Sequence, residues 1–139
     1  MSAAPAGYIA LVEDDDSLRR ATARLLAAYS FEVCAYASAR EFLDSLELSQ
    51  PVCLILDLQM NDMTGLELLH YLARTDFRFP TIVTTAHDEP GTRHRCGLAG
   101  ASGFLLKPLH GDALQETIKR ALAGSSAERN ARGPREVTR

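Results

Sequence analysis

The sequence has no long apolar run, no excess of basic charge and no leader-like start. None of its apolar runs approaches the roughly 20 residues that a membrane-spanning helix needs. The first residues also lack the basic stretch that opens a signal peptide. The formal net charge of −3 argues against a nucleic-acid-binding surface on the main body. We therefore expect a cytoplasmic protein that binds neither nucleic acid nor membrane directly.

Cysteine is scarce, and its three occurrences, Cys34, Cys53 and Cys96, do not suit a disulfide framework because their number is odd. Two of them lie in apolar runs, which favours buried free thiols in a reducing cytoplasm. No spacing in the chain resembles a zinc site. We expect no role for these thiols in metal binding.

Hydrophobic residues make up 46% of the 139 residues, which is enough for one compact core and argues against a largely disordered chain. We expect a single domain at 7–124. After Gly124 apolar residues become rare, and Ser, Arg, Glu, Asn and Gly dominate. The sequence therefore predicts a linker or a disordered tail at 125–139.

Short apolar runs alternate along the chain with longer stretches of helical periodicity. Ser38 and Thr64 are each followed three residues later by glutamate, which predicts a capping box at two helix starts. The expected strands are 8–12, 32–36, 52–56, 81–85 and 103–106; the expected helices are about 17–29, 38–46, from 64 onwards and 112–123, with the weakest pattern at 90–100. This alternation predicts an α/β fold, a five-stranded parallel sheet with helices on both faces.

Polar side chains follow the expected strands at their carboxyl ends. Glu13 and Asp14 come after the first strand, Asp57 after the third, Thr85 ends the fourth, and Lys107 follows the fifth. In parallel sheets with helices on both faces, ligands bind beyond these carboxyl ends. We therefore expect the five side chains to meet at one edge of the sheet.

Carboxylates that crowd at one sheet edge repel one another unless a cation or a proton joins them. Oxygen ligands favour a hard ion, so Mg2+ is the natural candidate. For Glu13 to Asp16 the alternative is a solvated acidic turn at a helix start. Asp57 is different, because it ends a run so apolar that its carboxylate loses water on one side and needs partners.

A carboxylate beside a divalent ion can attack a phosphoryl group and form an acyl phosphate. The phosphoryl oxygens then need further partners, and Lys107 can supply an ammonium group and Thr85 a hydroxyl. Each residue alone is as easily a surface lysine or an ordinary strand threonine. Their joint placement favours a phosphoryl-accepting role for Asp57.

These residues lie in motifs that resemble the receiver domain of two-component response regulators, over about 8–123. The resemblance is closest to the FixJ-type subclass and implies the flavodoxin-like (βα)5 receiver fold. The matching motifs are Val12-Glu13-Asp14-Asp15, Leu56-Asp57-Leu58-Gln59-Met60, Met63-Thr64-Gly65-Leu66-Glu67, Thr85-Ala86-His87, Ala99-Gly100-Ala101 and Phe104-Leu105-Leu106-Lys107-Pro108. All of them occur in the family order and at family-like spacing.

The resemblance implies a phosphoacceptor at Asp57 with Mg2+ beside it. Asp14 matches the direct Mg2+ ligand, Glu13 the acid that acts through water, and Gln59 the position whose backbone carbonyl completes the ligand set. Lys107 matches the lysine that contacts the phosphoryl group. Asp15 is expected to be a surface or capping residue.

The resemblance also implies a switch. Thr85 matches the hydroxyl that moves toward the phosphoryl group, and Phe104 the aromatic whose rotamer couples the site to the last helix and strand. Lys107-Pro108 corresponds to a bond that is usually cis in the family. The side chains of Gln59 and His87 flank the pocket at variable positions and are expected to modulate access of water to the acyl phosphate.

One departure from the family concerns the loop after the phosphoacceptor, where Asn61-Asp62 replaces the usual Pro-Gly. Both residues tolerate turn conformations, so the loop can still form. We expect it to be less rigid, with Asp62 adding negative charge near the metal. Mg2+ affinity and phosphorylation lifetime are the properties that this departure affects.

The implied partner is a sensor histidine kinase, which supplies the phosphoryl group from a phosphohistidine. The protein would then catalyse only its own phosphorylation and dephosphorylation and would not be an enzyme in the usual sense. Phosphorylation is expected to change the face formed by about 91–99 and 105–118, with homodimerisation as one consequence. The output would be control of transcription through an effector domain absent from this chain, or none if the receiver stands alone.

Three other functions compete with this interpretation. A phosphorylation-independent receiver could act as a protein-binding module. A Mg2+-dependent phosphatase of the haloacid dehalogenase type needs a second acid two residues after its nucleophile, where this chain has Gln59. A flavodoxin needs a Ser/Thr-rich phosphate loop after the first strand, where the four acids from Glu13 to Asp16 would repel a phosphate.

Overall fold

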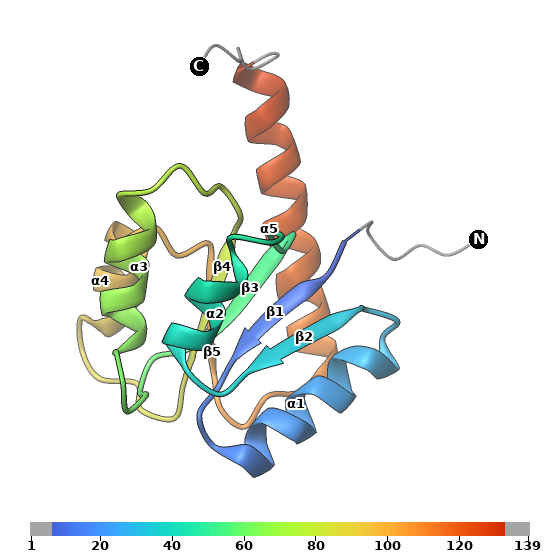
Figure 1. The fold of residues 1–139 in the computed structure, drawn as a ribbon, viewed down its shortest axis with the longest axis vertical. Coiled ribbons are helices and arrows are strands. Elements are labelled where there is room, and N and C mark those ends of the chain that lie inside the picture. The colour runs from blue at the N-terminus through green and yellow to red at the C-terminus, as the bar shows by residue number, and fades with distance from the viewer. Residues whose placement is uncertain (1–6, 133–139) are drawn as a thin grey trace.

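The computed structural model describes the backbone of residues 7–132 and the side chains of residues 7–125. Within this part of the chain five parallel strands form one sheet in the order β2-β1-β3-β4-β5. The strands are β1 (Ile9–Val12), β2 (Val33–Tyr36), β3 (Cys53–Asp57), β4 (Thr81–Thr85) and β5 (Gly103–Leu106) (Figure 1). The predicted fold, a flavodoxin-like α/β domain, is confirmed.

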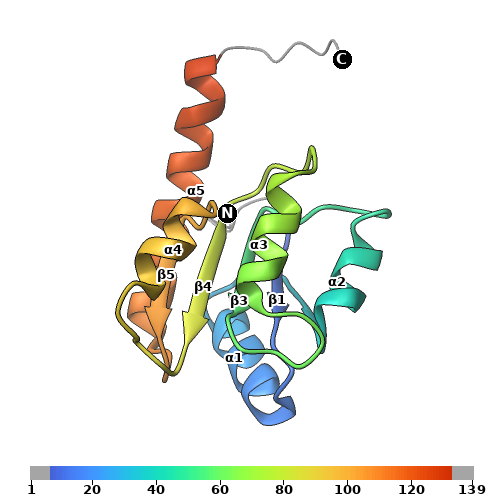
Figure 2. The ribbon, with the colours of Figure 1, turned by 90° about the vertical axis from the view of Figure 1, so that its left-hand side faces the viewer.

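Five helices alternate with the strands and cover both faces of the sheet. They are α1 (Asp16–Ala28), α2 (Ala39–Ser45), α3 (Gly65–Ala73), α4 (Thr92–Leu98) and α5 (Gly111–Arg132). Helices α1 and α5 pack on one face, and α2, α3 and α4 pack on the other (Figure 1). Figure 2 is turned toward the second face, where α3 and α4 lie in front of the sheet.

The central strands are buried on both faces, and this explains their continuous apolar runs. Leu54 and Leu56 of β3 face the core beneath α2, α3 and α4, whereas Ile55 faces the core beneath α1 and α5. Phe42 of α2 and Ile118 of α5 are fully buried in these two cores. Two packed cores hold the carboxyl ends of the strands in a fixed position.

The helix starts follow the sequence signals to different degrees. At α3 the capping box is complete, since Thr64 accepts from the Glu67 N–H and Glu67 accepts from the Thr64 N–H. At α2 only half of the expected box forms: Ser38 accepts from the Glu41 N–H, but Glu41 accepts from the Ala37 N–H. Asp15 caps α1 by accepting from Leu18 N at 2.9 Å, as expected for a capping residue.

Helix α5 is longer than predicted. It was expected to end near Ala123, but it continues to Arg132 and extends beyond the rest of the domain (Figure 1). The helix therefore includes 125–132 of the segment expected to be a linker or a disordered tail, and 133–139 lie outside the described residues. A single Gly124 costs only about 1 kcal/mol relative to Ala in a helix, which is too little to end one by itself.

The three cysteines are free, as predicted: Cys34 is exposed, and Cys53 and Cys96 are buried. Burial raises the pKa of the Cys53 thiol to about 12, so this thiol stays protonated and inert. In the region that the structure describes, no helix has the length and apolar character to cross a membrane.

Candidate functional site

The carboxyl ends of four strands bring the predicted polar residues to one edge of the sheet. Asp57 ends β3 and Thr85 ends β4, while Glu13 and Lys107 directly follow β1 and β5. The ligand oxygens of Glu13, Asp14 and Asp57 all lie within 4.8 Å of one another. Of the five side chains expected to meet, Glu13, Asp14, Asp57 and Lys107 are in mutual reach, whereas the Thr85 hydroxyl is bonded to Gln59 and His87.

Lys107 joins two of the acids. Its Nζ lies 2.7 Å from Glu13 Oε1 and 3.0 Å from Asp57 Oδ1. All three side chains are largely withdrawn from water, with 15% of the Lys107 side chain, 6% of that of Glu13 and 5% of that of Asp57 exposed. Two carboxylates therefore share one ammonium group in a partly dry environment, where their charges interact more strongly than in bulk water.

The peptide bond between Lys107 and Pro108 is cis, as the family resemblance implies.

The Asp57 carboxylate is incompletely satisfied. Its Oδ1 is buried and has no aligned hydrogen-bond donor among the described residues, so the 3.0 Å contact with Lys107 is an ion pair of poor hydrogen-bond angle. Burial raises the pKa of the Asp57 carboxyl to about 6; the Glu13 charge adds to the rise, and Lys107 and the backbone of Gln59 oppose it. An oxygen in this state is available to an incoming electrophile or cation.

Lys107 stays positively charged in this setting. Burial alone lowers the pKa of the Lys107 ammonium, but its contacts with Glu13 and Asp57 outweigh that effect and raise the pKa above its ordinary value. A fixed ammonium beside Asp57 can neutralise charge that arrives on that carboxylate.

Glu13 and Asp14 are held differently. Glu13 is buried, and beyond Lys107 its Oε2 accepts from Asp15 N at 3.2 Å. Asp14 is half-buried, and its Oδ2 accepts from Asn61 N at 2.9 Å. The loop after β3 thus touches the second acid through its backbone, which fixes that carboxylate at the mouth of the site.

The Thr85 hydroxyl is fully engaged. It lies 3.0 Å from Gln59 Oε1, to which it donates, and it accepts from His87 N at 3.1 Å. Thr85 has no exposed surface. The Gln59 side chain was predicted to flank the pocket, but its bond to Thr85 has no counterpart in the sequence pattern. His87 takes part through its backbone.

Phe104 is half-buried on β5, and a cation covers its ring. Arg93 of α4 places its Cζ 4.5 Å from the ring centroid. This contact has no local signal in the sequence, because the weak pattern of α4 does not show which of its basic residues points toward β5. Arg93 is the residue near the expected switch that sequence reasoning missed.

The carboxylate of Asp62 bonds to the start of α2. Its carboxylate accepts from Ala39 N at 3.4 Å and from Arg40 N at 3.1 Å, at the start of α2. Asp62 is not one of the three acids that come together at the sheet edge, and its carboxylate accepts hydrogen bonds in the first turn of α2, where anions are stabilised. The same two hydrogen bonds attach the loop after β3 to the start of α2. They restrain the loop at the place where the family usually has Pro-Gly.

The donors at this edge suit Mg2+. The three carboxylates offer hard oxygen ligands within 4.8 Å of one another, and the buried Oδ1 of Asp57 lacks an aligned donor. Mg2+ prefers a small number of carboxylate ligands completed by water. The residues present therefore fit this ion.

Comparison with known proteins agrees with the geometry. The chain is 34% identical over 122 residues to nodulation protein W of Bradyrhizobium diazoefficiens, which covers 88% of this chain and 52% of that protein. It is 33% identical over 111 residues to the transcriptional regulatory protein FixJ of Rhizobium meliloti, covering 80% of this chain and 54% of FixJ. The crystal structure of FixJ-N superposes with a TM-score of 0.76 at 32% identity, covering 84% of this chain and 94% of that one.

A parallel α/β domain with carboxylates and a lysine at one sheet edge agrees with the class of phosphoryl-accepting signalling domains. The family model for the response regulator receiver domain matches residues 9–119 of the chain. The chain therefore belongs to this family. The resemblance to the FixJ type is confirmed. Receiver domains accept phosphoryl groups, bind Mg2+ at an acidic pocket and interact with sensor histidine kinases. The chain spans about half the length of the two curated relatives named above.

Proposed function

We propose that Asp57 accepts a phosphoryl group from a phosphohistidine of a sensor kinase in a Mg2+-dependent reaction. The observation that carries the proposal is the buried Asp57 Oδ1, which has no aligned donor among the described residues and lies 3.0 Å from the Lys107 ammonium. A carboxylate that is poorly solvated but charge-balanced is a competent nucleophile. The domain acts on itself and does not turn over a separate substrate.

In the transfer step a carboxylate oxygen of Asp57 forms a bond to phosphorus while the bond from phosphorus to the imidazole nitrogen of the kinase breaks. The imidazole keeps the electron pair of that bond and takes up a proton. The Lys107 ammonium, already held between Glu13 and Asp57, neutralises a phosphoryl oxygen. Glu13 thereby serves as the residue that keeps this ammonium in place.

The Mg2+ ligands we propose are Asp14, Asp57 and the backbone carbonyl of Gln59, with Glu13 acting through water. When bound, the ion offsets negative charge on the phosphoryl oxygens. Asp14 is oriented for this role by the hydrogen bond from Asn61 N. The anchored Asn61-Asp62 loop therefore acts on Mg2+ affinity through Asp14.

The switch we propose begins at Thr85. To bind a phosphoryl oxygen its hydroxyl must give up the bond to Gln59 Oε1, and Phe104 then turns inward. The face formed by α4, β5 and α5 changes as a result. Its consequences would be contact with a second copy of the chain and control of transcription through an effector domain. The side chain of Gln59 and the residue His87 would modulate how long the phosphoryl group survives.

A cytoplasmic location is part of the proposal, because the three free thiols are stable in a reducing compartment. The competing function is a receiver that binds a protein partner without being phosphorylated. The Asp57 Oδ1, which is ion-paired to Lys107 but lacks an aligned hydrogen-bond donor among the described residues, favours phosphorylation, since a pure binding module has no need of a destabilised buried carboxylate.

Intact mass after incubation with acetyl phosphate and Mg2+ tests the proposal. We expect the wild type to gain the mass of one phosphoryl group and Asp57→Asn to gain none. Omission of Mg2+ should abolish the gain. An unchanged wild-type mass would favour the phosphorylation-independent module, and a gain that survives in Asp57→Asn would move the acceptor to another residue.

A further inference from the structure

Arg93 is an exposed residue of α4 whose guanidinium lies over the ring of Phe104. The distance from Arg93 Cζ to the ring centroid is 4.5 Å. A cation within about 6 Å of an aromatic centroid is attracted to the ring face. Arginine is especially suited to this contact because its planar group stacks on aromatic faces. The contact joins a helix to a strand that are expected to move relative to each other.

The ring of Phe104 lies between this cation and the core. Phe104 pairs in register with Val83 of β4 and packs against the core cluster that contains Cys96 of α4 and Ala99, the residue that follows this helix. Arg93 lies over the ring face, and part of Phe104 stays exposed to solvent beside this contact. A ring that turns further inward must leave the guanidinium.

The second residue of the expected switch is also held in place. Thr85 is bound to Gln59 Oε1 at 3.0 Å and to His87 N at 3.1 Å. The bond to Gln59 is local to the phosphorylation site, whereas the contact of Arg93 with Phe104 lies on the surface that α4 presents. The two contacts can therefore be altered separately.

We propose that Arg93 is a positioning residue that holds Phe104 in its resting position. A residue of α4 then contributes to the free-energy difference between the resting and the switched state. This inference rests on the proposed function, in which phosphorylation turns Phe104 inward. A contact made only in the resting state shifts the equilibrium toward rest by the free energy of that contact. Loss of the contact lets the same phosphoryl group populate the switched state more fully.

The expected effect is moderate because Arg93 is exposed. Cation–π contacts at exposed sites correspond to about a two- to fivefold change in an equilibrium constant. Arg93→Gln keeps most of the length and removes the charge and the guanidinium. Arg93→Lys keeps the charge but stacks less well, so it should fall between Arg93→Gln and the wild type.

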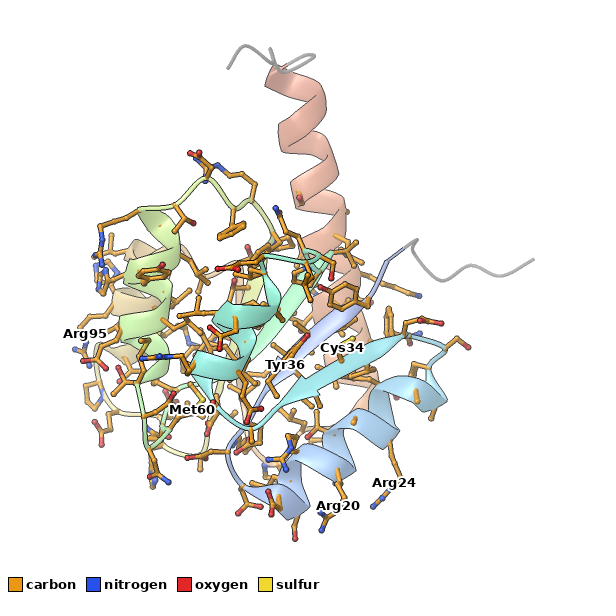
Figure 3. All side chains as sticks on the ribbon, viewed as in Figure 1. Arg20, Arg24, Cys34, Tyr36, Met60 and Arg95 are labelled. Atoms are coloured by element: carbon orange, nitrogen blue, oxygen red, sulfur yellow. The ribbon has the colours of Figure 1, made fainter. Side chains whose placement is uncertain are left out.

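Arg95 provides a matched control on the same helix. Its Nη2 lies 3.3 Å from Thr92 Oγ1, and Figure 3 shows it at the outer edge of the molecule on the side of α3 and α4. Arg95→Gln makes the same change of charge on α4 without touching the ring of Phe104. A difference between Arg93→Gln and Arg95→Gln therefore isolates the ring contact from the general charge of the helix.

The experiment uses protein labelled with 4-fluorophenylalanine at its five phenylalanines. The resonance of Phe104 is assigned from its loss in Phe104→Leu. Each variant is titrated with beryllofluoride, a phosphoryl mimic, in the presence of Mg2+. We expect the midpoint of Arg93→Gln to fall about two- to fivefold below that of the wild type, with its resting Phe104 shift already displaced toward the switched value. Arg95→Gln should match the wild type.

Two results would overturn the inference. If the midpoint of the beryllofluoride titration is the same for Arg93→Gln and the wild type, the contact of Arg93 with the Phe104 ring does not hold the resting state. If Arg95→Gln shifts by the same amount as Arg93→Gln, the charge of α4 and not the contact is responsible. A wild type whose Phe104 resonance never responds to beryllofluoride contradicts the proposed switch itself, and this result is distinct from the other two.

Discussion

Helices α3 and α4 lie on the same face of the sheet, and each follows a strand that is buried along its whole length, yet they are built differently. Helix α3 has nine residues, a complete capping box and four buried positions. Helix α4 has seven residues and two buried positions. Its N-cap is Gly91, with φ of 85°, which provides no side-chain hydrogen bond to the helix start. One helix is fixed by its cap and core, and the other is held by few interactions, as expected of an element that moves.

The strands that precede these two helices end on residues that differ in their hydrogen bonding. β3 ends on Asp57, whose buried carboxylate lacks an aligned donor in the described part of the chain. β4 ends on Thr85, whose hydroxyl both donates and accepts a hydrogen bond. The incompletely satisfied carboxylate therefore ends the strand that precedes the firmly held helix α3. The hydroxyl of the proposed switch ends the strand that precedes the weakly held helix α4.

The largest expected effect comes from the cores under the two helices. Leu68 of α3 is fully buried, whereas Leu98 of α4 is 75% exposed. We expect Leu68→Ala to lower the free energy of unfolding by about 2–5 kcal/mol and Leu98→Ala by less than about 0.5 kcal/mol. Urea denaturation measures both. Similar losses in the two variants would remove the contrast between the helices.

The buried charge at the end of β3 gives the next effect. Because the pKa of Asp57 is raised to about 6, the folded protein binds this proton more tightly than the unfolded chain does. Protonated Asp57 therefore stabilises the folded protein at low pH, and this stabilisation is lost as the pH rises from about 4 through 6. At neutral pH the ionised Asp57 carboxylate destabilises the folded protein. We expect Asp57→Asn to raise the free energy of unfolding at pH 7 without Mg2+, by roughly 1–2 kcal/mol after allowance for relaxation.

Denaturation at pH 7 and pH 4, with Mg2+ chelated, measures this change. The gain should shrink at pH 4, where Asp57 itself is protonated. Asp44→Asn, at an exposed carboxylate of α2, is the control and should stay within about 0.5 kcal/mol of the wild type at both values. A loss of stability in Asp57→Asn at pH 7 would mean that Lys107 fully satisfies the carboxylate.

The cap of α3 gives a smaller effect. Thr64 Oγ1 accepts from Glu67 N at 3.1 Å. We expect Thr64→Ala to lower the free energy of unfolding by about 1 kcal/mol, and Thr64→Ser, which keeps the hydroxyl, to restore most of it. If Thr64→Ala is neutral, the cap does not explain why α3 is more firmly held than α4.

The smallest effect concerns Gly97 within α4. A Cβ added at Gly97 would meet nothing within 4 Å, so alanine fits there. We expect Gly97→Ala to stabilise α4 by about 0.5–1 kcal/mol through helix propensity and to slow hydrogen exchange at 92–98. Gly91→Ala is the opposite control, because φ of 85° at Gly91 strains any L side chain. Faster exchange in Gly97→Ala would contradict this account of α4.

The strand ends were predictable because burial on both faces leaves a strong signal in the sequence. The run at 52–56 and the acid that closes it locate Asp57, and the parallel topology then brings Lys107 beside it. The cap at Thr64 was predictable for a similar reason, since its two partners are three residues apart. Features that depend on residues close in sequence, or on the strand topology alone, can therefore be predicted from the sequence.

Contacts between side chains of separate elements were not predictable. Asp62 reaches the start of α2, and Arg93 reaches the ring of Phe104, across elements whose relative rotation no local pattern encodes. The length of α5 was not predictable either, because apolar residues become rare after Gly124 although the helix continues to Arg132. Polar residues such as Arg and Glu are good helix formers without any core to face.

The central claim is that a phosphoryl group on Asp57 acts on α4 and leaves α3 in place. Hydrogen exchange followed by mass spectrometry, with and without beryllofluoride in the presence of Mg2+, tests it most directly. We expect exchange at 92–98 to change on addition of the mimic, exchange at 65–73 to stay constant, and neither segment to respond in Asp57→Asn. Equal changes in both helices, or a response of α4 that persists in Asp57→Asn, would contradict the account.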